Sequence, residues 1–233
     1  MTKDIRALTF DTGGTLLNWH GGLLSAFEKA GRAHGLGDRP WAETVNEYRR
    51  RSLKRMVGAI DPPFNIDDVH REELAKLVGE MNLPFGAEEM TQISNAWHSL
   101  DAWPDVAGGL SRLRRRYSVV AFTILSVSLV MDASRKNRMD WDCILSCELL
   151  RVYKTNKEAY DMAAEKLALQ PRQIMMVACH NFDLMAARAA GYRSAFVRRP
   201  SEWGVAGPPD PTPHPEHDIV ATDLEDLAQQ LGA

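Results

Sequence analysis

Short apolar runs recur along the chain and predict β-strands. The clearest are Ile5–Phe10, Val119–Leu125, Ile174–Ala178 and Ser194–Val197, and weaker ones are Cys143–Leu145 and Ile219–Val220. Between most of them, apolar residues return every three or four positions, which is typical of amphipathic helices. These helices are expected at Gly108–Arg116, Ser128–Arg138, Lys157–Leu169, Asn181–Ala190 and Leu224–Leu231. Strands that alternate with helices predict an α/β fold whose parallel sheet is covered on both faces.

The segment 21–103 has a different pattern, because it contains helical periodicity and no convincing strand. The expected helices are Leu23–His34, Trp41–Val57, Asp67–Met81 and Ala87–Leu100, separated by Gly- and Pro-containing breaks. We therefore expect residues 1–20 and 104–233 to form the α/β core and residues 21–103 to form an inserted all-helical cap. A cap at this point lies beside the carboxyl ends of the strands, where open α/β sheets bind ligands.

Two further segments are interpreted as surface. Arg199–His217 contains six prolines and predicts an irregular surface loop. The basic stretches Arg49–Arg51 and Arg112–Arg116 have helical spacing, so we interpret them as solvated helix faces rather than as nucleic-acid contacts.

Composition narrows the class of protein. The chain has 233 residues, 45% of them hydrophobic and 25% charged, which fits one globular domain with a sizeable insertion. Its formal net charge of −3 gives no overall attraction for nucleic acid. No apolar run is long enough to cross a bilayer or to act as a secretory signal. Three cysteines without a Cys-x-x-Cys pair favour a reducing cytoplasm.

The segment Asp11–Thr15 follows the first predicted strand directly. A carboxylate at the carboxyl end of a strand lies at the open edge of the sheet, and Gly13 and Gly14 permit close approach of a ligand to the backbone. Asp11 fits a nucleophile that forms a covalent ester. It equally fits a residue that caps a turn.

Other strand ends carry polar residues too. Ser126 follows the second long strand, Lys154 precedes a helix, and Asp183 follows the strand Ile174–Ala178. Each has an ordinary explanation: a helix N-cap for Ser126, a solvated amine for Lys154, a first-turn acid for Asp183. Because the carboxyl ends of parallel strands meet at one edge, a shared site explains all of them together. In such a site Lys154 would keep Asp11 ionised.

This arrangement resembles the haloacid dehalogenase superfamily, with its Rossmann-like core and inserted cap. The resemblance covers essentially the whole chain, with Asp11–Thr15 as the Asp-x-x-Gly-Thr element. The segment from Val152-Tyr153-Lys154 through Met176–Leu184 is similar to the type II, or L-2-haloacid dehalogenase, branch. The resemblance implies a hydrolase without cofactor or metal that converts a small anionic 2-haloacid into a 2-hydroxy acid through an ester on Asp11.

The resemblance also implies site residues. The catalytic ones are Asp11, Lys154, Asp183 and His180, with His180 or Asp183 as the base of the second step. The substrate-binding ones are Thr12, Thr15, Trp19, His20, Ser126, Val127, Tyr160 and Asn181. For His20 a surface role at the cap linker is the competing interpretation, and Cys179 is interpreted as a small buried residue. Caps in this branch often supply a dimer surface, so a homodimer is a further expectation.

Several positions depart from the family pattern. Gly13 stands where phosphatases of the superfamily carry a second Asp, and Cys179 stands where they carry an acid for Mg²⁺, which prefers oxygen ligands. Val127 replaces the Asn that lines the halide site in the dehalogenase branch. Arg49–Arg51 do not stand at the expected offset from Tyr48 for a halide-binding arginine. The alternatives are therefore a hydrolase opening another activated C–X bond, such as an azetidine-2-carboxylate ring, a Mg²⁺-dependent phosphatase, and a non-catalytic binding protein.

Overall fold

The computed structural model describes residues 4–57, 63–209 and 211–233. Its centre is a sheet of six strands in the order β3-β2-β1-β4-β5-β6, and every neighbouring pair is parallel. The strands are β1 (Ala7–Phe10), β2 (Ser118–Thr123), β3 (Cys143–Ser146), β4 (Ile174–Ala178), β5 (Arg193–Val197) and β6 (Ile219–Ala221). The predicted α/β fold with a parallel sheet is confirmed, and all six strands lie where the apolar runs predicted them.

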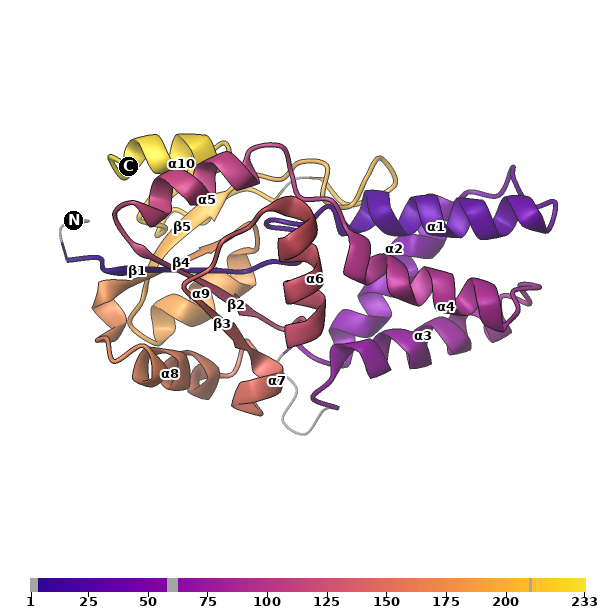
Figure 1. Cartoon of the computed structure of the whole chain (residues 1–233), viewed down its shortest axis with the longest axis horizontal. Helices are drawn as coiled ribbons and strands as arrows, with labels where there is room; N and C mark the ends of the chain where they lie inside the picture. The colour runs from indigo at the N-terminus through magenta and orange to yellow at the C-terminus, as the bar shows by residue number, and fades with distance from the viewer. Residues whose placement is uncertain (1–3, 58–62, 210) are drawn as a thin grey trace.

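Helices cover both faces of the sheet because each crossover between parallel strands must return over a face. The core helices are α5 (Val106–Arg114), α6 (Val127–Asn137), α7 (Cys147–Leu150), α8 (Lys157–Lys166), α9 (Asn181–Ala189) and α10 (Leu224–Gln230), with a 3₁₀ turn η2 (Pro171–Gln173). Figure 1 shows α5 and α10 side by side at one face, with α8 on the other side of the sheet. The central strands β1 and β4 are buried along their whole length.

A block of helices projects beyond the carboxyl ends of the strands, at the right of Figure 1. It consists of α1 (Trp19–Ala33), α2 (Trp41–Lys54), α3 (Ile66–Glu80), α4 (Ala87–Ala96) and the 3₁₀ turn η1 (Trp97–Ser99). The first of these helices begins at Trp19, two residues before the expected cap boundary, because the Asn18 side chain accepts a hydrogen bond from Gly21 N and caps it there. The exact division between core and cap stays a prediction.

Specific polar contacts hold this helical block against the sheet edge. Ser126 Oγ at the start of α6 donates to Asp67 Oδ2 on α3 at 2.7 Å. Asn65 Nδ2 donates to Glu148 Oε1 on α7 at 2.9 Å. A third contact joins the helical block to the segment after β5, where Asn46 Nδ2 on α2 donates to the carbonyl oxygen of Trp203 at 3.0 Å. The residues at the sheet edge therefore lie between core and cap.

The segment after β5 is irregular and largely exposed, as its prolines predicted, but some of its residues are buried. Arg199 and Glu202 are 8% and 6% exposed. The guanidinium of Arg199 donates two hydrogen bonds to the Asp105 carboxylate, and its Nε donates to the carbonyl oxygen of Thr15. The interpretation as surface is wrong for these residues because an ion pair, which hydrophobic periodicity does not record, draws the segment inward. Among the described helices, none combines the length and the apolar character that a membrane span requires.

Candidate active site

Asp11 lies immediately beyond β1 and is almost fully buried. Lys154 Nζ donates to its Oδ1 at 3.1 Å, and Thr15 Oγ1 donates to its Oδ2 at 2.8 Å. His180 Nδ1 lies 3.3 Å from Oδ2. Burial alone would raise the pKa of Asp11, but the charges of Lys154 and His180 and the Thr15 hydrogen bond outweigh it and lower that pKa well below its ordinary value. Asp11 is therefore a buried, ionised carboxylate.

Lys154 has no free donor left. Besides Asp11, its Nζ donates to Asp183 Oδ2 at 2.6 Å and to the carbonyl oxygen of Phe122 at 3.0 Å. Burial opposes the charge, but Asp11 and Asp183 together raise the pKa of Lys154 above its ordinary value. The other Asp183 oxygen, Oδ1, accepts a hydrogen bond of 2.6 Å from Tyr160 OH. Lys154 is thus a fixed cation, and both oxygens of Asp183 are occupied.

His180 forms a second connection from Asp11. Its Nε2 lies 3.0 Å from Glu202 Oε1 and 3.4 Å from Cys179 Sγ. Burial lowers the pKa of His180, but Cys179, Glu202 and the hydrogen bond to Asp11 raise it well above its ordinary value overall. Trp19 Nε1 donates to Glu202 Oε1 at 3.1 Å. The contacts from Asp11 to His180 and from His180 to Glu202 therefore connect the end of β1, the start of α9 and the segment after β5.

Arg49 completes the charged set, and its interpretation as part of a solvated face is wrong. It is 2% exposed on α2, and its guanidinium lies over the rings of Trp19 and Trp97. Among the described residues, its Nε and Nη1 have no hydrogen-bond partner. Burial lowers the pKa of Arg49, and the nearby Glu202 and Asp11 act against this. A buried guanidinium with unused donors is a ready receptor for an anion.

These residues surround a small cavity of about 20 Å³, which is room for about one water molecule. Asp11, Lys154, His180 and Asp183 line it from the core, together with Gly13, Ile124 and Phe182. Arg49, Leu53 and Val57 line it from the helical block. The structure thus brings all four predicted catalytic residues to one point.

The predicted substrate-binding residues divide into two groups. Thr15 and Tyr160 contact Asp11 and Asp183 directly. The others serve neighbouring structure, and none of them lines the cavity in the described part of the chain. Thr12 forms a hydrogen bond with Thr123, and Trp19 forms one with Glu202. Ser126 forms hydrogen bonds with Asp67 and Leu129, and the backbone N of Val127 donates to Glu148. Asn181 forms hydrogen bonds with Thr212, His214 and His217, and His20 is buried against Gly204.

Sequence reasoning missed Arg49 and Glu202. A signal for Arg49 existed, because it continues the buried stripe Trp41, Val45 and Tyr48 along one face of α2. Glu202 lies in an irregular segment, where no periodicity could indicate burial.

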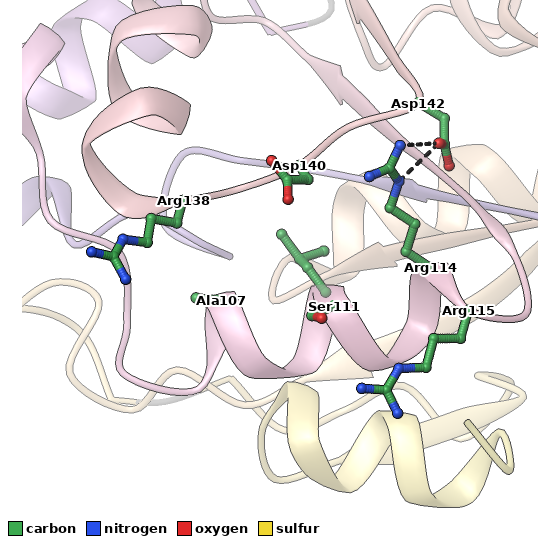
Figure 2. Close-up of a pocket in the computed structure, with 8 residues that line it drawn as sticks. Ala107, Ser111, Arg114, Arg115, Arg138, Asp140 and Asp142 are labelled. Atoms are coloured by element: carbon green, nitrogen blue, oxygen red, sulfur yellow. Dashed lines mark hydrogen bonds and ion pairs between the residues drawn. The ribbon is translucent and has the colours of Figure 1, made fainter.

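A larger pocket of about 450 Å³ lies at the opposite, amino-terminal edge of the sheet. Figure 2 shows Arg114 paired there with Asp142, and Arg115 and Arg138 around it. None of the residues around Asp11 contributes to this pocket, so its volume does not make it the reaction site.

A family model described as haloacid dehalogenase-like hydrolase matches residues 5–191. The chain belongs to this family. The predicted superfamily and the predicted enzyme class are therefore confirmed. The matched residues of this haloacid dehalogenase-like hydrolase include both the strand ends around Asp11 and the helical block. Glu202, which contacts His180, lies beyond the matched residues.

Individual relatives agree with the family. The hydrolase is 25% identical over 206 residues to (S)-2-haloacid dehalogenase 4A of Burkholderia cepacia, with 85% of each chain covered. It is 26% identical over 222 residues to (S)-2-haloacid dehalogenase 1 of Pseudomonas sp. strain CBS-3, with 87% of this chain and 89% of the relative covered. A crystal structure of a defluorinating L-2-haloacid dehalogenase is 33% identical, covers 98% of this chain with 96% of its own, and superposes with a TM-score of 0.89.

Proposed function

We propose that this hydrolase removes the halogen from small 2-haloacids and releases 2-hydroxy acids. The observation that carries the proposal is the buried pair of Asp11, an ionised carboxylate, and Arg49, a cation with unused donors, on facing walls of one cavity. A nucleophilic carboxylate opposite an anion receptor suits a substrate that is itself an anion and releases another. The relatives named as 2-haloacid dehalogenases support this substrate class.

The first step is a displacement at carbon. An Asp11 carboxylate oxygen attacks the α-carbon, a C–O bond forms, and the carbon–halogen bond breaks with its electron pair leaving on the halide. Thr15 and Lys154 hold the Asp11 carboxylate in one orientation. Since Lys154 has no donor to spare, Arg49 is the group that receives the halide or the substrate carboxylate. This role also compensates for Val127, which is not among the described residues that line the cavity.

The second step hydrolyses the ester. Water attacks the Asp11 carbonyl carbon, the C–O bond to Asp11 Cγ breaks, and the 2-hydroxy acid leaves as Asp11 is restored. Of the two bases that the resemblance allowed, Asp183 has both oxygens engaged by Lys154 and Tyr160. His180 lies 3.3 Å from Asp11 Oδ2 and lines the cavity, so it is the base that we propose. Formation of the ester removes the Asp11 charge that helps to hold a proton on His180, so its Nδ1 becomes able to accept one in this step. Glu202 keeps its ring in place.

Cavity size limits the substrate. Because about 20 Å³ is room for only about one water molecule, a 2-haloacid must shift the helix α2 or the side chains that α2 contributes to the cavity. We therefore expect haloacetates and 2-halopropionates to be turned over and acids with long side chains to be rejected.

The decisive experiment is a single turnover in ¹⁸O-water with enzyme in excess over 2-chloropropionate. An ester on Asp11 predicts that the first product carries unlabelled oxygen and that the label enters the peptide containing Asp11. Native protein should release chloride from one enantiomer, and Asp11→Asn should release none. Absence of chloride release from a panel of small 2-haloacids would contradict the proposal, and azetidine-2-carboxylate and an aryl phosphate with Mg²⁺ test the alternatives.

Two further expectations, the cellular compartment and the oligomeric state, accompany this proposal. The three cysteines are free thiols, which supports a reducing compartment such as the cytoplasm. A homodimer formed through the cap rests on the family resemblance, and light scattering of the purified protein tests it.

A further inference from the structure

We propose that Cys179, His180 and Glu202 form a binding site for a divalent transition-metal ion of the zinc type, and that the bound ion arrests the enzyme after its first chemical step. The binding part of this proposal stands on the ligand geometry alone. The arrest rests on the proposed dehalogenase function.

Cys179, His180 and Glu202 each offer one ligand atom, and these three atoms all lie within 4.8 Å of one another. Cys179 Sγ lies 3.4 Å from His180 Nε2, and His180 Nε2 lies 3.0 Å from Glu202 Oε1. The other carboxylate oxygen, Glu202 Oε2, lies 3.6 Å from Cys179 Sγ. At a tetrahedral zinc ion with bond lengths of about 2.0–2.3 Å, a nitrogen and an oxygen ligand lie about 3.3 Å apart, and a sulfur lies about 3.5 Å from either. Small shifts of these side chains would therefore admit the ion.

The ligand types select the metal. One thiolate, one imidazole and one carboxylate suit Zn²⁺ and Co²⁺, whereas Mg²⁺ and Ca²⁺ prefer oxygen ligands throughout. The same Cys179 that disfavours a Mg²⁺ site therefore favours a softer ion. Binding releases the proton of the Cys179 thiol, and any proton on His180 Nε2, to solvent.

Each ligand also has a partner in an outer layer. His180 Nδ1 faces Asp11 Oδ2 at 3.3 Å, the carboxylate–histidine–metal order that orients metal-binding histidines. Trp19 Nε1 donates to Glu202 Oε1 at 3.1 Å, and Thr15 Oγ1 lies 3.5 Å from Cys179 Sγ. These contacts hold the three ligands before any ion arrives.

A route to the site exists. A pocket of about 400 Å³ opens beside the ligands, and Cys179, His180 and Glu202 line part of its wall. The remaining wall is mainly apolar, with Phe182, Trp203 and several prolines of the segment after β5. Since the protein supplies three ligands, water from this pocket can take the fourth position.

The ion would stop catalysis at a defined point. A metal on His180 Nε2 leaves the ring's remaining proton on Nδ1, facing Asp11. That nitrogen then has no lone pair to accept a proton from water, so the ester is not hydrolysed. Attack of Asp11 on the substrate does not use His180 as a base and can still occur. With the metal bound, each active site should release one halide and then stop with the ester trapped.

The experiment uses the full chain after treatment with a chelator. Titration with Co²⁺ should give a thiolate-to-cobalt absorption band that saturates at one ion per chain, and Zn²⁺ should displace it. Zn²⁺ should convert steady halide release into a burst of one halide per chain, and chelator should restore turnover. Mass spectrometry should find the ester on the Asp11 peptide.

Cys179→Ser is the diagnostic variant, because it removes a ligand without changing any residue assigned to the reaction. It should lose the cobalt band, keep its turnover without metal and become at least about tenfold less sensitive to Zn²⁺. Cys143→Ser, a change at a cysteine outside the site, is the matched control and should behave as the native protein. If Cys179→Ser does not fold, Glu202→Gln must weaken Co²⁺ binding by a similar factor.

The outcomes separate the two proposals. A native protein without the cobalt band, or Zn²⁺ inhibition that Cys179→Ser leaves unchanged, overturns the metal site even when halide release is normal. A cobalt band in a protein that releases no halide supports the site and contradicts only the dehalogenase function. Zn²⁺ inhibition without a halide burst overturns the proposed arrest point.

Discussion

The Nη2 atom of Arg49 lies 3.2 Å from the position that a Cβ atom on Gly13 would occupy. The cap arginine therefore reaches the loop that carries the nucleophile, and Gly13 leaves it the room to do so. A side chain at position 13 would therefore crowd the Arg49 guanidinium.

Arg49→Lys tests this contact. A lysine keeps the charge but loses the planar set of donors, so we expect kcat/KM for a 2-haloacid to fall about 10- to 100-fold, equivalent to about 1.5–3 kcal/mol for a hydrogen bond to a charged group. Arg50→Lys, at the exposed neighbouring position, is the matched control and should be close to native. Equal kinetics of the two variants would remove Arg49 from the substrate site.

Tyr160→Phe tests the support of Asp183. The Tyr160 hydroxyl donates to the buried, charged Asp183, whereas the Tyr192 hydroxyl donates at 2.7 Å to the neutral carbonyl oxygen of Tyr160. We expect Tyr160→Phe to lower the free energy of unfolding by about 1.5–3 kcal/mol and Tyr192→Phe by about 1 kcal/mol. Urea denaturation of both variants measures the difference. A larger loss for Tyr192→Phe would show that the charge of Asp183 does not strengthen its hydrogen bond.

The predictable part of the site follows from the strands. Asp11 and His180 lie just beyond strand ends, Asp183 lies in the first turn of the helix that follows β4, and Lys154 lies between the two helices that follow β3. Parallel strands bring their carboxyl ends, and the segments that begin there, to one edge whatever the side-chain details. Ser126 shows the limit of that argument. It lies at the same edge, but its hydroxyl caps α6 and binds Asp67 of the cap, an orientation that depends on how the cap packs.

The residues that could not be predicted are held by tertiary contacts between charges. Glu202 is brought inward by His180 and Trp19, and Arg199 by Asp105. Hydrophobic periodicity carries no information on such pairs, so a segment rich in proline was interpreted as surface. The observed helix boundaries differ by a few residues from the predicted ones for a related reason. Side-chain caps such as that of Asn18 set the ends of helices, and hydrophobic periodicity does not record them.

Arg199→Met tests the anchoring of the segment after β5. The substitution leaves the largely buried Asp105 without its bidentate partner and frees the carbonyl oxygen of Thr15. Removing one partner of a buried ion pair costs about 3–5 kcal/mol. We expect that loss in urea denaturation. The double variant Arg199→Met with Asp105→Asn should recover part of it, and no recovery would mean that the ion pair is not the source of the cost.

The last prediction concerns pH and His217. Its ring is buried against Phe196, with Nδ1 3.2 Å from Ser194 Oγ and Nε2 2.9 Å from Asn181 Oδ1. Burial, then the charges of His214 and Arg188, lower the pKa of His217 from 6.5 to about 4, while Asp218 and Glu216 act in the opposite direction.

Because the folded pKa of His217 is the lower one, the unfolded chain binds a proton between pH 6.5 and 4 that the folded protein does not. The contribution of neutral His217 to stability is therefore complete above pH 6.5 and is lost as the pH falls toward 4. Denaturation midpoints of native protein and His217→Gln across this range measure the effect. The variant should be less stable at pH 8 and should lose less stability on acidification. Carboxylates with lowered pKa values, such as Asp105 and Asp142, are common to both proteins and cancel in the difference. Parallel curves from pH 8 to 4 would show that His217 titrates alike in the folded and unfolded states.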